Sequence, residues 1–177
     1  MASCKLLIIG HARHGKDTVA EWITRNTPMR FVSSSEYACK HVVWPVLAPQ
    51  YGYATMQECF EDRAAHREEW FNIIGQYNKD DKARLAKEIL SEVDMYVGMR
   101  ALEEFKAAEP LFNAIIWVDA SKRQPAESVQ SCQLTLPIVQ QNTTRTVLVI
   151  DNNGSVDDLH AQLTEKLRPY VIKHATK

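Results

Sequence analysis

Residues 5–19 of the chain read KLLIIGHARHGKDTV. The apolar run at 5–9 stops at a glycine and predicts a short strand that is buried on both faces, as in parallel sheets. Residues 17–25 carry apolar side chains at helical spacing, and Pro28 ends this second element. A buried strand, a glycine-containing turn and a helix in direct succession predict the first βα unit of an α/β fold.

The turn between these two elements, residues 10–16, has the pattern G-x-x-x-x-G-K. In that setting, glycines allow backbone N–H groups to turn toward phosphate oxygens, and the helix N-terminus adds partial positive charge. The lysine then reaches the outer phosphates as a point charge. A turn that binds nothing would not need the strand, the spacing, the lysine and the helix together. We therefore predict a loop that binds a nucleoside triphosphate through Gly10, Arg13, His14, Gly15 and Lys16.

Asp17 occupies the position at which such a loop usually carries a serine or threonine that holds Mg²⁺. In one interpretation, Asp17 holds the ion through water, and the hydroxyl of Thr18 contributes from the next position. In the other, Asp17 stabilises the start of the helix, where a carboxylate is favourable. The sequence leaves both open, so Asp17 and Thr18 are candidate magnesium ligands.

The remaining chain alternates between strand-like and helical segments. Strands are predicted at 30–32, 95–98, 114–119 and 147–151. Helices are predicted from about 35 to the prolines at 45 and 49, across most of 55–93, and at 101–108 and 156–167. This alternation predicts an α/β fold, with a mostly parallel five-stranded sheet and helices on both faces, in one domain covering 1–177. The irregular segment at about 121–145 is predicted to form a short, mobile lid.

The composition is that of a soluble globular domain of 177 residues, with 45% hydrophobic and 24% charged residues and a formal net charge of −1. This charge excludes a protein that coats DNA or anionic membranes, but not an enzyme with a local basic cleft. The four cysteines have no metal-binding spacing, which favours reduced thiols in a cytoplasmic protein. A signal-peptide pattern is absent, as is any apolar run of about 18 residues, so we expect no membrane partner.

The loop G-x-x-x-x-G-K-D-T at 10–18 resembles that of phage deoxynucleoside monophosphate kinases and phosphomevalonate kinases, which carry Lys-Asp at this position. Three later segments resemble the third, fourth and last strands of that group with the residues that follow them: VGMRALEEF (97–105), WVDA (117–120) and DNNGSVDDL (151–159). A closer resemblance is to the shorter phage P-loop kinases that phosphorylate 5-hydroxymethyluracil within DNA. The resemblance implies a three-layer P-loop kinase fold, ATP as phosphoryl donor, Mg²⁺, and the host cytoplasm as location if the chain is phage-encoded.

An alcohol acceptor would need a carboxylate near the attacking oxygen, and Glu36 is the candidate for this base. It follows the second predicted strand, at the carboxyl edge of the sheet, where ligands of open α/β folds bind. The sequence S33-S-S-E36 also fits a capping box, which would give Glu36 a structural role instead. Asp17 is the second choice for the base. Where the resembled kinases usually have an aspartate after the third strand this chain has Gly98, and Asp94 lies at the opposite end of that strand.

Arginines are the residues that best bind phosphate, because the guanidinium group offers a fork of N–H donors. Arg100 follows the third predicted strand and matches the arginine of the resembled group, which implies contact with substrate or phosphate. Arg63 and Arg67 lie four residues apart on one predicted helix face, as substrate contacts or as part of a solvated face. Arg123 follows the fourth strand, where kinases of this shape carry lid arginines that neutralise the transition state.

Two further positions are candidates for binding a base. Tyr37 is adjacent to Glu36 and is the aromatic residue that we expect to stack on an acceptor base. Asn153, together with Asn152, lies where related folds read the adenine of ATP, although Asn-Asn-Gly is also an ordinary turn sequence.

Three functions remain open from the sequence. The first is a kinase for 5-hydroxymethyluracil in DNA, and the second is a deoxynucleoside monophosphate kinase that acts on free nucleotides. The third is a regulatory protein that binds ATP without transferring its phosphate. The near-neutral charge counts against tight DNA binding, since duplex-binding proteins favour a basic footprint. The sequence does not define the oligomeric state.

Overall fold

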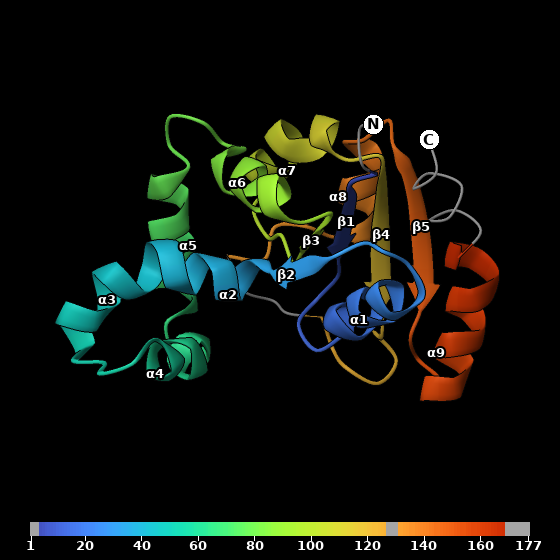
Figure 1. The fold of residues 1–177 in the computed structure, drawn as a ribbon, viewed down its shortest axis with the longest axis horizontal. Helices are drawn as coiled ribbons and strands as arrows, with labels where there is room; N and C mark the ends of the chain where they lie inside the picture. The colour runs from blue at the N-terminus through green and yellow to red at the C-terminus, as the bar shows by residue number, and fades with distance from the viewer. Residues whose placement is uncertain (1–3, 127–130, 169–177) are drawn as a thin grey trace.

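The computed structural model describes residues 4–126 and 131–168. In this part of the chain, five parallel strands form one sheet in the order β2-β3-β1-β4-β5 (Figure 1). The strands are β1 (Leu6–Ile9), β2 (Phe31–Ser33), β3 (Met95–Val97), β4 (Ala114–Asp119) and β5 (Thr146–Asp151). The predicted α/β fold with a parallel sheet is confirmed, and each strand lies close to its predicted position.

Helices surround this sheet. In chain order they are α1 (Lys16–Asn26), α2 (Ser34–Ala38), α3 (Trp44–Tyr51), α4 (Met56–Glu61), α5 (Arg67–Tyr77), α6 (Arg84–Glu92), α7 (Leu102–Ala108), α8 (Leu136–Gln141) and α9 (Val156–Gln162). Shorter helical turns extend or follow them: η1 (Cys39–Val43), η2 (Asp62–Ala64), η3 (Glu109–Leu111) and η4 (Leu163–Leu167).

The central strand β1 explains the three-layer arrangement. Its side chains alternate in direction, as in any strand. Leu6 and Ile8 pack on one face with buried residues of α1 and α9. Leu7 and Ile9 pack on the opposite face, where α2, α5, α6 and α7 supply the core. Because both faces are covered, every residue of β1 is buried, which is the reason that this strand reads as a continuous apolar run.

The helical segment after β2 continues past its prolines. The helix α2 passes into the π-helical turn η1 and then into α3, which ends at Gly52 with φ of 74°. Pro45 lies in the first turn of α3, where a missing N–H is tolerated, and Pro49 lies inside the same helix. The prediction that these prolines end the helix is therefore wrong, because the wide turn η1 takes up the irregularity just before Pro45.

Residues 131–145 pack against the core instead of forming a free lid. They contain α8, and the side chains of Leu134 and Val139 are buried in the cluster that also includes α5, α6 and α7. Thr135 begins α8 with an N-cap hydrogen bond from the backbone N–H of Ile138. The predicted mobile lid is corrected for this half of 121–145, while residues 127–130 lie outside the described residues.

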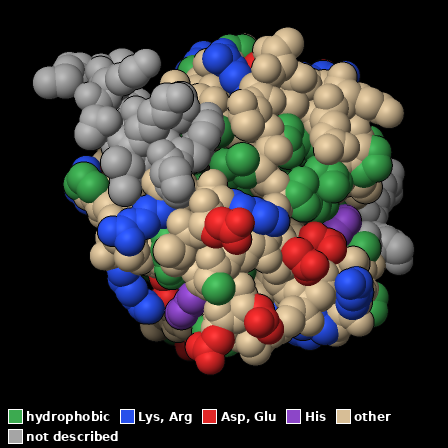
Figure 2. Space-filling view, turned by 90° about the vertical axis from the view of Figure 1, so that its right-hand side faces the viewer, with side chains coloured by type: hydrophobic (Ala, Val, Ile, Leu, Met, Phe, Trp, Pro, Cys, Tyr) green, Lys and Arg blue, Asp and Glu red, His purple; other side chains and the backbone are tan. Residues whose placement is uncertain are grey.

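The face that carries α9 shows Lys, Arg, Asp and Glu side chains interspersed (Figure 2). This mixed distribution agrees with the net charge of −1. Across the described residues, no helix combines the length and the apolar character needed to cross a membrane.

Candidate functional site

A cavity of about 810 Å³ lies at the carboxyl ends of β1, β2 and β3, the edge at which ligands bind in open α/β sheets. Of the residues predicted from the sequence, its wall contains Gly10, Arg13, Lys16, Asp17, Glu36, Arg63, Arg67 and Arg100. These residues are far apart in the chain. The fold therefore brings the predicted phosphate-binding loop and the predicted acceptor-side residues into one space.

The loop between β1 and α1 is held from behind by buried polar groups. Asn152 donates from Nδ2 to the backbone oxygen of His14 (2.8 Å). Gly15 has φ of 92°, and a Cβ at this position would collide with the Asn152 amide. Glycine is thus required here both for its backbone conformation and for the close approach of Asn152. The sequence indicated this asparagine as an adenine contact or as part of a turn, and not as a support for the loop.

His14 supports the loop instead of facing the cavity. Its ring is fully buried, and Nδ1 accepts a hydrogen bond from the backbone N–H of Ala120 (3.0 Å). Because Nδ1 accepts, the proton is on Nε2, which lies 3.0 Å from the backbone oxygen of Gln124 and donates to it. The predicted direct role of His14 in nucleotide binding is therefore corrected to a positioning role.

The N-terminus of α1 opens without a side-chain cap. Gly15 is the N-cap residue, and no side chain of the described residues makes a capping hydrogen bond there. The preceding Arg13 has φ of 62°, a left-handed conformation that is uncommon for a residue with a side chain. Uncapped N–H groups and the helix dipole favour an anion at this position. Asp17 lies in the first turn of α1 and lines the cavity. It makes no capping hydrogen bond, but its negative charge complements the positive end of the helix dipole.

Lys16 is a half-buried cation on the wall of the cavity. Its Nζ donates to the backbone oxygen of His11 (2.8 Å). Burial lowers the pKa of Lys16 to about 8, and the charge of Arg100 contributes to the decrease. A bound anion would have the opposite effect on this pKa, because it favours the protonated form.

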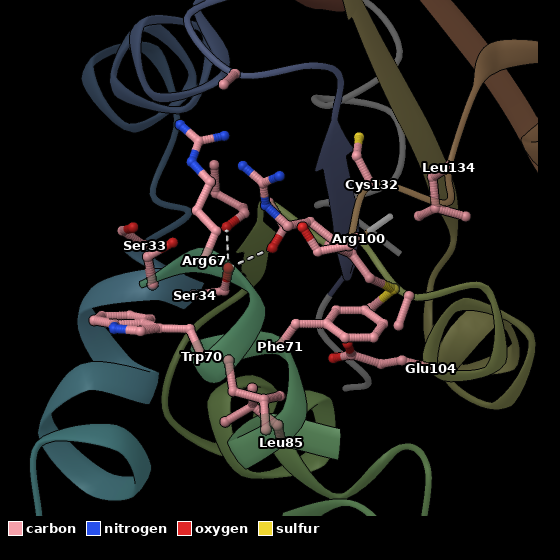
Figure 3. Close-up of a pocket in the computed structure, with 18 of the residues that line it drawn as sticks. Ser33, Ser34, Arg67, Trp70, Phe71, Leu85, Arg100, Glu104, Cys132 and Leu134 are labelled. Atoms are coloured by element: carbon pink, nitrogen blue, oxygen red, sulfur yellow. Dashed lines mark hydrogen bonds between the residues drawn. The ribbon is translucent and has the colours of Figure 1, made fainter. Parts of the chain in front are cut away.

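Three arginines surround the part of the cavity that faces Lys16. Burial lowers the pKa of Arg100, and Arg67 and Arg63 lower it further. Figure 3 shows the side chains of Arg67 and Arg100 directed toward the same region. Arg63 and Arg67 line the cavity, so they are more than a solvated helix face. Guanidinium groups that repel one another around one space indicate a site for an anion.

The positions of Arg63 and Arg67 depend on the turn between α4 and α5. There, His66 Nδ1 lies 2.8 Å from Glu69 Oε1, and His66 Nε2 lies 3.1 Å from Asp62 Oδ2. Both ring nitrogens can donate only when the ring is protonated. The hydrogen bond to Glu69 raises the pKa of His66, and Asp62 raises it further.

This arrangement predicts a pH-dependent contribution of His66 to stability. Because the folded pKa of His66 lies above its ordinary value of 6.5, its contribution is fully present below that pH and is lost as the pH rises through the folded value. The melting temperature of the wild type should exceed that of His66→Gln by a margin that shrinks as the pH rises above 6.5. A margin that is constant over this range would contradict the assignment.

Glu36 lines the cavity from the first turn of α2. Ser33 is the N-cap residue of this helix, but its side chain makes no capping hydrogen bond, so the capping box that the sequence allowed does not form. Ser34 instead directs its hydroxyl group to the backbone oxygens of Val97 and Gly98 (Figure 3). Glu36 is thus available for a role toward a ligand.

Gly98 explains why the usual acidic residue is missing after β3. Its φ is 89°, and a Cβ would lie 3.3 Å from Ser34 Oγ and 3.7 Å from Lys16 Cε. A side chain here would be strained by this backbone conformation, and its Cβ would be tight against Ser34 Oγ but in ordinary contact with Lys16. Asp94 does not replace the missing acid, because it binds Lys5 Nζ (3.3 Å) at the other end of the strand.

Sequence reasoning missed a buried carboxyl group in this cavity. Glu104 of α7 is 7% exposed and lines the cavity together with Tyr96. The hydroxyl of Tyr96 donates to Glu104 Oε1 (2.8 Å). Burial raises the pKa of Glu104 to about 7, and the hydrogen bond from Tyr96 only partly opposes this increase. The sequence signal was weak, since paired glutamates on a short helix usually face solvent.

The raised pKa of Glu104 predicts that it destabilises the fold at neutral and alkaline pH. The folded protein holds this proton up to about pH 7, whereas the ordinary pKa is 4.5. Stability therefore falls as the pH rises through this window and then levels off. We expect Glu104→Gln to gain melting temperature relative to the wild type between pH 4.5 and 7. Parallel curves for the two proteins would contradict the burial of an ionisable group.

Two residues predicted at the acceptor or metal site lie outside the cavity. Tyr37 is buried in the core, where its hydroxyl donates to Glu92 Oε1 (3.3 Å) and its ring packs on His41. The structure thus contradicts its predicted contact with a substrate base, because α2 directs this side chain inward. Thr18 is exposed on α1 and does not line the cavity, so we leave it out of the candidate magnesium site.

Two residues predicted at the nucleotide site are engaged in the turn after β5. The Asn153 amide nitrogen donates to Asp119 Oδ2 (3.2 Å) and to Asp151, and its oxygen accepts from the backbone N–H of Lys122 (2.8 Å). Arg123 donates from Nε to the backbone oxygen of Asn152 (2.6 Å). Neither side chain lines the cavity, and both make structural contacts in this turn. These contacts favour the turn interpretation of Asn153, while its adenine contact and the lid role of Arg123 stay predictions.

The described residues fit Mg²⁺ only in combination with phosphate. No group of three or more His, Cys, Asp or Glu side chains within 4–126 and 131–168 could hold a metal ion. Mg²⁺ in nucleotide sites commonly uses one or two carboxylates, several waters and the phosphates themselves. Asp17 meets this requirement from the cavity wall. It would hold the ion, which would neutralise charge on the phosphates.

Comparisons with known proteins assign the chain to no family. No protein-family profile and no curated protein sequence matches the chain. Among solved structures, the chain is similar to a sugar kinase from Janibacter sp. HTCC2649, solved without ligand, with 13% sequence identity and a TM-score of 0.44. The match covers 92% of this chain and 94% of that one. A similarity of this size defines neither an activity nor a substrate.

Proposed function

We propose that this protein is an ATP-dependent phosphotransferase whose donor site is the loop at 10–16. The observation that carries the proposal is that Lys16 and Arg100 are half-buried and line one cavity, close enough for the charge of Arg100 to lower the pKa of Lys16. The uncapped N-terminus of α1 borders the same space. The N–H groups of α1 and the positive charges of Lys16 and Arg100 therefore border the same space. They complement the negative charge that a transferring phosphoryl group carries.

Glu36 supports an alcohol as the acceptor, and the resemblance to phage kinases makes this alcohol the hydroxymethyl group of 5-hydroxymethyluracil in DNA. In the proposed step, the hydroxymethyl oxygen attacks the γ-phosphorus of ATP, and the bond to the β,γ-bridging oxygen breaks. ADP leaves, and the hydroxyl proton passes to the Glu36 carboxylate. Asp17 would hold Mg²⁺ on the phosphates, in agreement with its place on the cavity wall.

The arginines favour a second candidate acceptor, a free deoxynucleoside monophosphate. Arg63, Arg67 and Arg100 surround one part of the cavity. An acceptor phosphate would be bound by such guanidinium forks and, being already anionic, would need no strong base. For this acceptor, Glu36 would have no proton to remove.

The test offers the full chain ATP and Mg²⁺ with either hydroxymethyluracil-containing DNA or free deoxynucleoside monophosphates, and it measures ADP and labelled product. Glu36→Gln should lower turnover on the DNA by roughly 10²-fold, the size of a general-base contribution. The exposed Glu21→Gln on α1 is the matched control. An unchanged rate in Glu36→Gln with monophosphate turnover supports the second acceptor. Absence of ADP formation with either acceptor contradicts the phosphotransferase and supports an ATP-binding regulatory protein.

A further inference from the structure

The cavity extends past the arginines to an inner end whose walls are mainly apolar and aromatic. Trp70, Phe71, Leu85 and Glu104 line this end, away from the guanidinium groups of Arg67 and Arg100, with the Trp70 ring and the Glu104 side chain on opposite sides of the view (Figure 3). The walls are flat or apolar, which suits the faces of a planar ring. The polar groups that accompany them are few and buried, as in sites that fix the orientation of a small molecule.

Glu104 provides a hydrogen-bond acceptor at this inner end. Above about pH 7, where Glu104 is ionised, its carboxylate has about four lone-pair positions, and the hydrogen bond from Tyr96 occupies one of them. Leaving a buried charged acceptor without further partners is costly. The side chain therefore has the capacity to accept a hydrogen bond from a ligand N–H group.

One further side chain provides donor N–H groups. Asn78 is 3% exposed and lines the cavity, and its Oδ1 already accepts from the backbone N–H of Leu85 (3.1 Å). Its amide NH₂ is then the end that can serve a ligand. An acceptor accompanied by donors complements a ring that carries an N–H group beside carbonyl groups, as uracil-type bases do.

We propose that the inner end of the cavity binds the base of the acceptor nucleotide, with Glu104 accepting a hydrogen bond from the ring N–H of a uracil-type base. This inference rests on the proposed function, because it makes the ligand the phosphoryl acceptor. Glu104 is the specificity-determining residue, and Tyr96 positions its carboxyl group. The sugar and phosphate of the ligand then extend toward Arg67 and Arg100.

The experiment measures binding of two ligands to the full chain by calorimetry without ATP. The ligands are thymidine 5′-monophosphate and its N3-methyl analogue, which lacks the ring N–H. The wild type should bind the methyl analogue at least about 10-fold more weakly, the effect of losing a hydrogen bond to a charged group. In Glu104→Gln, which keeps an acceptor for Tyr96 and can fold, thymidine 5′-monophosphate should lose a similar factor and the preference between the ligands should disappear.

The matched control is Glu88→Gln. Glu88 also accepts a hydrogen bond from a tyrosine, Tyr77 (2.8 Å), but it does not line the cavity. It should leave both affinities unchanged. The proposal is overturned if the wild type binds neither ligand, if it binds both equally, if Glu104→Gln keeps the preference, or if Glu88→Gln has the same effect. N3–H-dependent binding without ADP formation from ATP would contradict the kinase and leave the base site intact.

Discussion

Lys16→Ala should lower phosphoryl transfer by about 10²–10³-fold or more, the cost of removing one preorganised charge from a transition state. Lys16 is positioned by a hydrogen bond to the backbone oxygen of His11 and lies close to Arg100. In the proposed reaction its ammonium group moves from His11 to the outer phosphates of ATP. The substitution removes this charge without removing a core side chain. The measurement is kcat/KM for ATP.

The exposed Lys40→Ala, which changes a lysine of η1 outside the cavity, serves as the control. It should leave kcat/KM within a few-fold of the wild type. Because the pKa of Lys16 is lowered by burial and by Arg100, Lys16→Ala should also keep or raise the melting temperature. Near-wild-type transfer by Lys16→Ala would remove the loop from the reaction.

Arg100→Ala should lower kcat/KM by about 10³-fold, the lower end of what an arginine contributes to phosphoryl transfer. Arg100 is the arginine whose charge lowers the pKa of Lys16. The charges of Arg67 and Arg63 lower the pKa of Arg100 in turn. Arg100 therefore connects the donor side of the cavity with the acceptor side. Arg100→Lys should recover only a small part of the activity, because an ammonium group cannot form the planar fork.

Arg25→Ala is the matched control for this prediction, since Arg25 is exposed on α1 and, within the described residues, pairs with Glu21 of the same helix. If Arg100→Lys transferred phosphate as fast as the wild type, a point charge would suffice and the fork would have no role. If Arg100→Ala were also fully active, Arg100 would lie outside the reaction.

The sheet and the loop were predictable because their signals are local. Leu6–Ile9 is apolar throughout since both faces of β1 are covered, and G-x-x-x-x-G-K fixes the turn that follows. Arg100 was predictable for a related reason. A residue that follows a parallel strand lies at the carboxyl edge of the sheet, and this position does not depend on how the helices pack.

The errors concern side-chain direction, which depends on tertiary packing. Tyr37 and Glu36 are adjacent, yet one turns into the core and the other lines the cavity, because helical neighbours point in different directions. The sequence around Asn153 fits either an adenine contact or a turn. Only the hydrogen bonds of its side chain with Asp119 and Lys122, seen in the structure, distinguish the two. Glu104 becomes buried only in the folded chain, where Tyr96 of β3 donates a hydrogen bond to it, so no local pattern could indicate its raised pKa.

The most direct test of the donor site is a crystal structure of the full chain with Mg²⁺ and an ATP analogue that cannot transfer its γ-phosphate. We expect the β- and γ-phosphates within the turn at 10–16, in contact with the N-terminus of α1, and Lys16 Nζ moved from the His11 oxygen to a phosphate oxygen. A turn that remains empty at saturating analogue, or an analogue bound elsewhere while Lys16 keeps its bond to His11, would contradict the phosphotransferase and the roles assigned to Arg100 and Glu36.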